Sequence, residues 1–460
     1  MHAPLAPHVH PSAAAPRAGP PELGEAWWPP AAYDRQALPV RMLVFGTGML
    51  LRSLPLALLD AANAAGRAAG RAVLVQSTGR GVADALRAQD GLYTLVERGV
   101  EGGAPVERTR LVGAVAGAHV AERDWALVRQ RAADPALRVI VSNVTEAGFR
   151  LLPADATARA DDLAGRVPSG FVGKLAALLA ARRDALGDAA PPLVVIPTEL
   201  VDDNGGALRA MLAAVLRGWP EGPALAAWCA RHVHVCASLV DRITTGAPPP
   251  EERAALARRL GYDDALLTVA ESYALWAVEG DPALLRAALP IDDGARAVFA
   301  PSIARFRQRK LRLLNGAHTA LAPLALRAGV ETVHAAATDP VLGPFLARVL
   351  EALAPTTGLP LEEARAYAAL VHDRFRNPAL AHRWAVIAQQ QTAKLRVRVV
   401  PALAPGAPPA TGGGAVPPAL ALALAAYLVA ARDGELPDDA EAGRAAAHWP
   451  AAGASADADA

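Results

Sequence analysis

The chain has 460 residues, about three times the length of an average domain, so two domains with separate cores are the first expectation. Hydrophobic residues make up 53% of it and charged residues 20%, which excludes a largely disordered protein. Its 46 basic and 45 acidic residues leave a formal net charge of +1, so net charge attracts neither nucleic acid nor an anionic membrane.

The two ends differ in composition from the rest. Residues 1–37 are rich in Pro and Ala without a period and predict a disordered or docking tail, with Trp27 and Trp28 as docking residues; residues 446–460 predict a flexible tail. No secretory signal opens the chain, and two cysteines make no disulfide framework, so a cytoplasmic enzyme is expected. The longest apolar run, residues 418–431, falls short of the ~20 residues of a membrane span and predicts a buried helix.

Short apolar runs alternate with helical patterns in the first half. The run at 40–45 (VRMLVF) is followed by a glycine turn, an amphipathic stretch and a second run at 72–76. Further runs follow at 138–142, 192–196 and 232–240. Strands that alternate with helices predict an α/β fold, a doubly wound parallel sheet of Rossmann type, over residues 38–247.

The pattern changes after a cluster of Gly and Pro at 246–250. Residues 251–445 show successive amphipathic helices, with no convincing strand alternation until 395–400. A mainly α-helical second domain is therefore expected over residues 248–445.

Gly46 and Gly48 follow the first strand and open a helix. Such a turn lets backbone N–H groups approach a pyrophosphate, although an ordinary tight turn has the same sequence. Arg52, one helical turn on, could reach a phosphate or face solvent. No acidic residue for ribose hydroxyls follows the second strand, where Arg80 could instead meet a 2′-phosphate, so NAD is expected and NADP is not excluded.

Lysine and asparagine are rare in this chain. Among 46 basic residues the lysines are Lys174, Lys310 and Lys394, and the asparagines are Asn63, Asn143, Asn204, Asn315 and Asn377. This composition is typical of a GC-rich coding bias, under which Lys and Asn persist where the structure needs them. Since a buried Lys, unlike Arg, can titrate near neutrality, its few positions are candidates for chemistry.

Lys310, Asn315 and His318 lie within one short stretch, RQRKLRLLNGAHTA. On a regular helix at ~100° per residue they project at about 0°, 140° and 80°, which permits convergence if the long lysine bends inward or Gly316 distorts the turn. A neutral amine there would take the proton of a secondary alcohol while hydride leaves the carbon, and the Asn and His side chains would stabilise the oxygen charge. The alternatives are a basic helix face with a core histidine and, less favoured, a nucleic-acid contact.

A C-x2-H-x-H-x-C cluster contains Cys229, His232, His234 and Cys236. A tetrahedral site rarely takes all four ligands from so short an extended segment, so no metal is expected.

Several motifs together resemble one family. They are FGTGMLLR at 45–52, SNVTEAG at 142–148, FVGKL at 171–175, PTELVDDNG at 197–205, SLVDRITTG at 238–246, ESYALWAVEG at 271–280, KLRLLNGAH at 310–318 and NPALAH at 377–382. The chain resembles the polyol-specific long-chain dehydrogenase/reductase family, also called the mannitol dehydrogenase family. The resemblance implies a Rossmann-type domain followed by a helical domain, and a nicotinamide coenzyme without zinc.

The same resemblance assigns candidate residues. It implies that Lys310 is the general acid/base and that Asn315 and His318 polarise the carbonyl, with Asp241 and Lys394 on the substrate side. Glu146 and Glu199 each follow a strand, where α/β sites gather, so either could touch substrate or coenzyme or cap the next helix. The expected coenzyme contacts are Phe45, Gly46, Gly48, Met49, Leu50, Arg52, Asn143 and Glu146. Lys174 and Asn204 also fall in motifs, as site contacts or as local structural residues.

One segment bears on the substrate. Where mannitol dehydrogenases keep an Asn, this chain has Leu200, and the pattern E-L-x-D-x-N-G resembles the tagaturonate reductase (altronate oxidoreductase) branch instead. The resemblance implies interconversion of D-tagaturonate and D-altronate with NAD(H) in uronate catabolism. Fructuronate reductase, a mannitol or arabinitol 2-dehydrogenase, and a non-catalytic nucleotide-binding sensor are the alternatives. Oligomeric state is not indicated.

Overall fold

The computed structural model describes residues 26–28, 33–79, 81–145, 147–292, 294–403 and 416–447. The chain forms two compact units. The first comprises Met1–Arg98 and Val106–Ile303, and the second comprises Gly99–Pro105 and Ala304–Ala460.

A six-stranded parallel sheet forms the centre of the first unit. Its strand order is β6-β3-β2-β7-β8-β9. The strands are β2 (Val40–Phe45), β3 (Arg71–Gln76), β6 (Val115–Val120), β7 (Val139–Ser142), β8 (Leu193–Pro197) and β9 (Val233–Val235). The chain order reverses between β2 and β7, and ligands of doubly wound sheets bind beyond the carboxyl ends of the strands at such a point.

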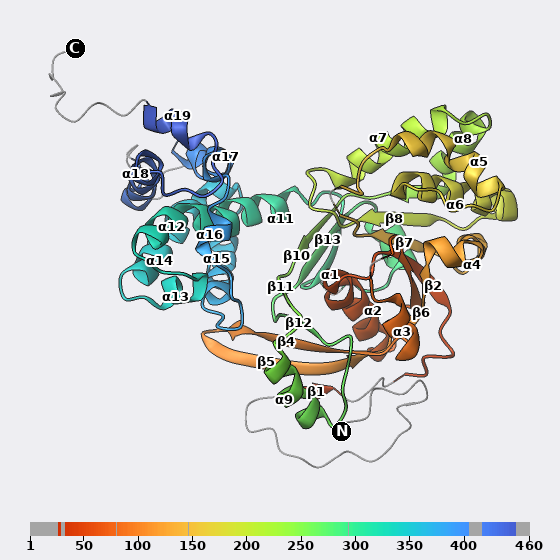
Figure 1. Cartoon of the computed structure of the whole chain (residues 1–460), viewed down its shortest axis with the longest axis horizontal. Coiled ribbons are helices and arrows are strands. Elements are labelled where there is room, and N and C mark those ends of the chain that lie inside the picture. Colours follow the sequence, from red (N-terminus) through yellow and green to blue (C-terminus); the bar gives the residue numbers. More distant parts are fainter. Residues whose placement is uncertain are drawn as a thin grey trace. The chain divides into compact units, whose positions relative to one another are not determined.

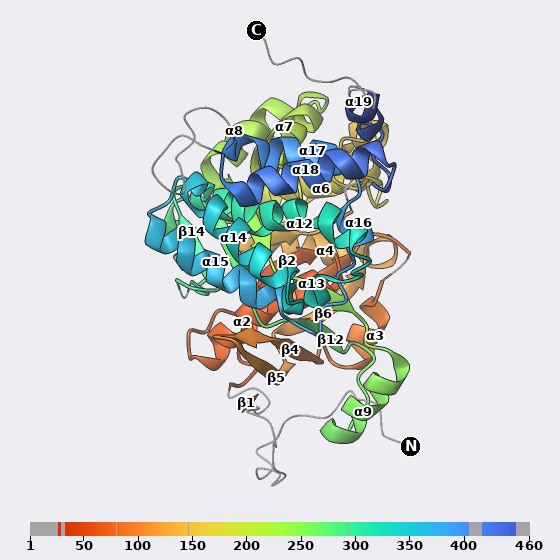
Figure 2. The same ribbon diagram turned by 90° about the vertical axis from the view of Figure 1, so that its left-hand side faces the viewer.

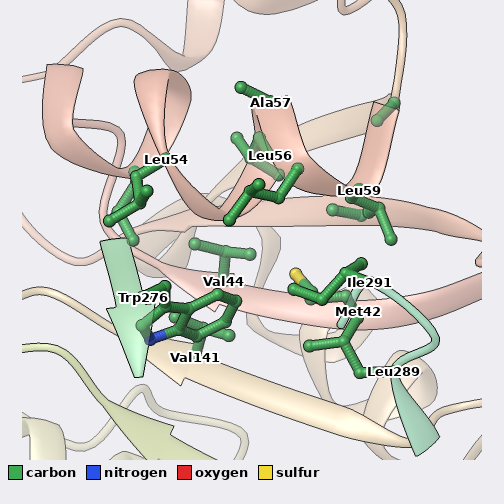
Figure 3. Packing of buried hydrophobic residues seen from close by; sticks show 14 of the residues in the cluster. Met42, Val44, Leu54, Leu56, Ala57, Leu59, Val141, Trp276, Leu289 and Ile291 are labelled. Carbon is green, nitrogen blue, oxygen red and sulfur yellow. The ribbon is translucent and has the colours of Figure 1, made fainter. Parts of the chain in front are cut away.

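The apolar run of β2 is continuous because both faces of the sheet are buried. Met42 and Val44 point to one face and pack with Leu56 and Trp276 in the core shown in Figure 3. Leu43 and Phe45, one residue out of phase, belong to the core on the other face.

Helices from the alternating pattern cover these two faces (Figure 1). Residues of α2 (Pro55–Ala64) contribute to the first core, and residues of α4 (Ala121–Ala133) and α6 (Phe171–Leu186) contribute to the second. The remaining helices of the unit are α1 (Met49–Ser53), α3 (Ala83–Ala88), α5 (Ala158–Leu163), α7 (Asn204–Arg217), α8 (Gly222–His232), α9 (Pro250–Leu260) and α10 (Pro282–Ala288).

Two smaller sheets belong to the first unit, apart from the residues of Gly99–Pro105 that one of them contains. One has the order β1-β5-β4-β12-β11 and the other β10-β13-β14. Their strands are β1 (Ala26–Trp28), β4 (Tyr93–Glu101), β5 (Ala104–Val112), β10 (Ser238–Asp241), β11 (Thr244–Gly246), β12 (Thr268–Glu271), β13 (Leu275–Glu279) and β14 (Ala297–Ala300).

These sheets differ from the sequence-based expectation in three places. The apolar run at 232–240 forms two strands, β9 and β10, in different sheets. Within the stretch expected to be helical, β12, β13 and β14 are strands that pair with others of the first unit. Each has only four or five residues, too few for alternation to stand out. The units accordingly divide after Ile303, whereas the sequence placed the boundary at 247/248.

The second unit is helical. Its helices are α11 (Ala304–Arg309), α12 (Gly316–Arg327), α13 (Val333–Thr338), α14 (Leu342–Leu353), α15 (Leu361–Phe375), α16 (Trp384–Ile387), α17 (Gln391–Arg398), α18 (Pro418–Arg432) and α19 (Ala442–Ala447). Between α11 and α12 the chain forms a π-helical turn, η3 (Lys310–Asn315). Figure 2 shows α12 among α14, α16, α17 and α18, each of which it contacts.

Two expectations for the C-terminal half have opposite outcomes. Residues 395–400, expected as a strand, form the end of α17 and a short 3-10 turn, so that expectation is wrong. The apolar run at 418–431 forms α18, as expected for a helix. Within the described ranges, no helix is both long enough and apolar enough to cross a membrane.

The tails are described only in part. Within the N-terminal tail, Ala26–Trp28 form β1, which pairs in parallel with β5. Residues 1–25, 29–32 and 448–460 lie outside the described residues.

A buried ion pair links three elements of the first unit. Arg242, directly after β10, donates to the Glu97 carboxylate on β4 and to the Ser53 carbonyl at the end of α1 (2.6 Å). Burial opposes ionisation of Glu97, yet Arg242, Arg110 and Arg296 hold its pKa at about 2. Breaking a buried pair from one side typically costs ~3–5 kcal/mol, because the remaining charge stays buried and uncompensated.

We expect Glu97→Gln to lower the free energy of unfolding by ~3–5 kcal/mol at pH 7. Because the pKa of Glu97 is lower in the folded state, its stabilising effect is complete above pH ~4.3, the value for unfolded chains, and is lost as the pH falls through about 2. Urea unfolding from pH 7 to pH 2 measures the difference between wild type and variant. A difference that stays constant below pH 4 would contradict the ionic origin.

Candidate active site

The glycine turn after β2 is crowded at its first residue. The Gly46 amide donates to the Val75 carbonyl (2.9 Å), and its φ of +122° is a conformation that L side chains rarely adopt. A Cβ there would lie 2.7 Å from Leu51 Cδ1 and 2.8 Å from the Asn143 carbonyl oxygen. Position 46 therefore requires glycine for folding.

The second glycine is free of such contacts. Gly48 is exposed and precedes α1, and a Cβ added to it would meet no atom within 4 Å. The first N–H groups of a helix lack intrahelical acceptors, so space beside them suits a phosphate. Met49 and Leu50 are half-buried, whereas Phe45 is fully buried with its ring centroid 5.3 Å from that of Phe171.

The ends of β7 and β8 lie next to this turn in the sheet. The Asn143 amide N–H donates to the Phe45 carbonyl (3.0 Å), and its side chain donates to the Thr198 carbonyl (3.0 Å). Glu199, buried, accepts hydrogen bonds from Ser142 Oγ (3.1 Å) and the Val144 amide (2.9 Å). Burial raises the pKa of Glu199, although these hydrogen bonds act to lower it. Both predicted residues thus join strand ends at the switch point; the predicted Glu146 lies outside the described residues.

Arg52 takes neither of the positions expected for it. Its guanidinium is buried, donates to the Leu266 carbonyl (2.7 Å) and lies 5.8 Å from the Tyr93 ring centroid. The Tyr93 hydroxyl in turn donates to the Arg52 carbonyl (2.6 Å). These contacts give Arg52 a structural role within the first unit.

One polar residue at the sheet edge was not singled out from the sequence. Ser77, directly after β3, has a buried hydroxyl with no hydrogen-bond partner among the described residues. In Rossmann folds the end of the second strand faces the ribose hydroxyls. The neighbouring Gln76 side chain is occupied with the Thr78 carbonyl and the Ala83 amide, and Arg80 lies outside the described residues.

In the second unit the candidate catalytic segment is not a regular α-helix. Lys310–Asn315 form the π-helical turn η3, whose hydrogen bonds run from residue i to residue i+5. Lys310 and Asn315 are five residues apart, so this turn brings them closer to one face than an α-helix would. Gly316 follows, where a Cβ would lie 3.0 Å from Leu353 Cδ1. Such single-turn bulges are frequent at functional sites.

Asn315 differs from the other asparagines. Four of them hydrogen-bond the backbone through their side chains, namely Asn63, Asn143, Asn204 and Asn377. The side-chain amide of Asn315 is half-buried and makes no hydrogen bond with the part of the chain that the structure describes. It retains donors for a ligand.

His318 is buried on α12. Its ring lies 4.1 Å from that of Phe375 and 5.1 Å from that of His382, between centroids. Nδ1 is 2.9 Å from the Leu314 carbonyl oxygen, which can only accept, so Nδ1 carries the hydrogen. Burial and the nearby His382 keep the pKa of His318 well below its usual value. The ring is therefore neutral, and its Nε2 is an acceptor.

The arginines around Lys310 are held by other helices. Arg309 lies 4.5 Å from the Tyr367 ring centroid and 3.9 Å from the Glu363 carboxylate, both on α15. Arg312 donates to the Val397 carbonyl (2.9 Å) at the end of α17. Both arginines are therefore anchored on helices other than their own.

The remaining candidates occupy defined places. Asp241 is buried on β10 in the first unit, and the neighbouring arginine, Arg242, pairs with Glu97. Lys394 on α17 donates to the Ile387 carbonyl (3.0 Å). Lys174 on α6 donates to the Ser169 carbonyl (2.9 Å), and burial lowers its pKa to about 8.

The cysteine and histidine cluster is dispersed. His232 stacks on Trp228 at 4.9 Å between centroids, and its Nδ1 lies 3.0 Å from the Ala190 carbonyl oxygen. Across the described residues, no group of three or more His, Cys, Asp or Glu is placed to hold a metal ion.

Comparison with known proteins identifies the family. The model of the mannitol dehydrogenase Rossmann domain matches residues 40–291, and that of the mannitol dehydrogenase C-terminal domain matches residues 302–432. The chain belongs to the mannitol dehydrogenase family.

Relatives of this mannitol dehydrogenase family member include proteins named altronate oxidoreductase. Altronate oxidoreductase from Klebsiella pneumoniae subsp. pneumoniae is 36% identical over 413 residues, 88% of this chain and 83% of the relative. That from Halalkalibacterium halodurans is 35% identical over 372 residues, 80% of this chain and 71% of the relative. The family and its predicted branch, and the prediction of an oxidoreductase, are confirmed; the chain is a polyol or sugar-acid dehydrogenase.

Solved structures confirm the fold class. Substrate-free D-sorbitol dehydrogenase matches with a TM-score of 0.72 at 24% identity, over 89% of this chain and 83% of that one. Pseudomonas fluorescens mannitol 2-dehydrogenase, solved with NAD and D-mannitol, matches with a TM-score of 0.66 at 24% identity, over 92% of this chain and 86% of that one. The individual site residues stay predictions.

The two glycines give a matched pair of variants. We expect Gly46→Ala to lower the free energy of unfolding by ~1–3 kcal/mol or more. Alanine rarely adopts the φ of +122°, and its methyl group would also clash with Leu51 and the Asn143 carbonyl. Gly48→Ala should leave the melting temperature unchanged, since its methyl meets no protein atom, but should weaken NADH binding at least ~10-fold by occupying the space beside the helix N-terminus. Thermal unfolding and NADH fluorescence titration measure both. Unchanged NADH affinity in Gly48→Ala would place the coenzyme elsewhere.

Proposed function

We propose that this protein is an NAD-dependent uronate-ketose reductase that interconverts D-tagaturonate and D-altronate, with Lys310 as the general acid/base. The observation that carries the proposal is the π-helical turn η3, which begins at Lys310 and ends at Asn315. The substrate is supported by relatives named altronate oxidoreductase at 33–36% identity over most of the chain.

Lys310 carries the proton in both directions. In reduction its ammonium gives a proton to the ketone oxygen as hydride reaches the carbonyl carbon, so that a secondary alcohol forms. In oxidation the neutral amine takes the hydroxyl proton while hydride leaves the carbon.

The two other residues take different roles in this proposal. The Asn315 amide, uncommitted among the described residues, donates a hydrogen bond to the oxygen as negative charge develops on it. His318 carries its hydrogen on Nδ1, bound to Leu314, so its Nε2 accepts a hydrogen bond from a substrate hydroxyl. Polarisation of the carbonyl, expected from both residues, thereby falls to Asn315.

The first unit fits a nicotinamide dinucleotide. The turn leaves space at Gly48, beside the N-terminus of α1, for a pyrophosphate, and the unpartnered hydroxyl of Ser77 is a candidate contact for a ribose hydroxyl. When bound, NADH supplies the hydride. The proposal includes coenzyme contacts from Met49, Leu50 and Asn143 and a substrate contact from Asp241, Lys394 or Glu199.

A substrate panel tests the reaction. We expect oxidation of NADH with D-tagaturonate to exceed that with D-fructuronate, D-fructose or D-xylulose, and NADPH to be the poorer donor. Lys310→Met, which keeps the length of the side chain, should lower kcat ~10²–10⁴-fold because the proton carrier is lost. NADH oxidation at 340 nm and NADH titration measure turnover and coenzyme binding separately.

Arg307→Met is the control, since Arg307 also lies beside the turn but has no role in the proposed chemistry. Undiminished turnover in Lys310→Met would remove the assigned base. Activity with D-fructuronate alone would move the protein to the other uronate reductase, and no activity with any ketose would favour the nucleotide-binding sensor.

A further inference from the structure

Three cations gather beside the catalytic segment in the second unit without a carboxylate partner. They are Arg312 on η3 and Lys394 and Arg398 on α17, here termed the α17 cation cluster. None of the three forms an ion pair with the residues that the structure describes. Their neighbours do: Arg396 pairs with Glu441, and Arg309 with Glu363.

Partial burial makes it unfavourable to keep these three positive charges close together. Desolvation lowers the pKa of all three side chains, and the charge of Arg398 further lowers that of Lys394. The negative charge of Asp439 acts on Lys394, but the Asp439 carboxylate accepts hydrogen bonds from the Thr392 amide (2.7 Å) and hydroxyl (2.8 Å). All three side chains are half-buried, and a bound anion would offset the repulsion between their like charges.

Both arginines of the cluster have donors to spare, and Arg398 is the one linked to Asn315 through Thr319. Arg312 donates from one terminal nitrogen to the Val397 and Arg398 carbonyls (2.9 and 3.1 Å), and the Lys394 ammonium donates to the Ile387 carbonyl. The Arg398 guanidinium makes a single hydrogen bond within the described ranges, from one terminal nitrogen to Thr319 Oγ1 (3.1 Å). An arginine has five N–H donors in a planar fork, which matches the two oxygens of a carboxylate.

A short chain of contacts connects Arg398 to the candidate catalytic residues. The Thr319 hydroxyl that accepts from Arg398 donates to the Asn315 carbonyl (2.9 Å). Asn315 and Thr319 are one helical turn apart, ~5–6 Å between side chains. In D-tagaturonate three carbons separate the ketone from the carboxylate, a span of roughly 5 Å at ordinary bond lengths. A ketone bound at Asn315 would therefore place this carboxylate near Thr319, the residue that Arg398 contacts.

We propose that the Arg398 guanidinium binds the carboxylate of the sugar-acid substrate and so selects aldonates and uronates over neutral polyols and ketoses. The inference rests on the proposed function and adds to it the residue that recognises the acid group.

Binding in the presence of NADH tests this without turnover. D-altronate and D-altritol, which has a CH₂OH group in place of the carboxylate, are titrated calorimetrically into the wild type and into Arg398→Met. We expect Arg398→Met to weaken D-altronate binding ~10–100-fold, in line with the loss of a charge-assisted hydrogen-bond pair, and to leave D-altritol binding unchanged. In turnover, KM for D-tagaturonate should rise by a similar factor with kcat little altered.

Two further variants separate recognition from structure. Arg396→Met removes an exposed arginine of the same helix and should change neither ligand's affinity. Arg398→Lys keeps the charge and should restore part of the D-altronate affinity. Equal weakening of both ligands, or no weakening of D-altronate, would overturn the proposal, as would lysine restoring none of the affinity in a variant with the wild-type melting temperature.

The outcome distinguishes this inference from the proposed reaction. If the wild type turns over D-fructuronate but not D-tagaturonate, the proposed epimer is wrong, and Arg398 keeps its role if Arg398→Met raises KM for that uronate. A wild type that prefers neutral ketoses would overturn the carboxylate site, whatever the effect of Lys310→Met.

Discussion

The proposed catalytic chemistry depends on a local distortion of one helix. In a regular α-helix Lys310 and Asn315 would project ~140° apart, too far to act on one oxygen. The π-helical turn from Lys310 to Asn315 removes much of this separation. The surrounding helices hold the distortion, since Arg309 is fixed on α15 and Arg312 on the end of α17. Gly316 lets the following helix approach Leu353.

Much of the first unit was predictable because its strands are buried on both faces. Parallel strands of this kind appear as uninterrupted apolar runs, and the switch point follows from the order of the strands. Strands β12 to β14 were missed because four or five residues leave no readable period. Residues 395–400 were misassigned because the alternation in LRVRVV imitates a strand, while packing of Leu395 and the contacts from Arg312 hold a helical end.

Most of the rare Lys and Asn side chains form hydrogen bonds to the backbone. Lys174 and Lys394 each donate to a backbone carbonyl, and four of the five asparagines tie the backbone of loops or turns. Asn315 stands apart because its amide has no such task in the described part of the chain. Neither the π-helical turn nor the tautomer of His318 has a sequence signal, since both arise from tertiary contacts.

Chemical rescue tests most directly whether the amine at position 310 carries the proton. Lys310→Ala is assayed with D-tagaturonate and NADH in the presence of small primary amines of increasing base strength. We expect turnover to be restored in proportion to amine concentration, with a rate that depends on the pKa of the amine. Failure of every amine to restore turnover in a variant that binds NADH and D-altronate normally would contradict the role of Lys310, as would full turnover without amine.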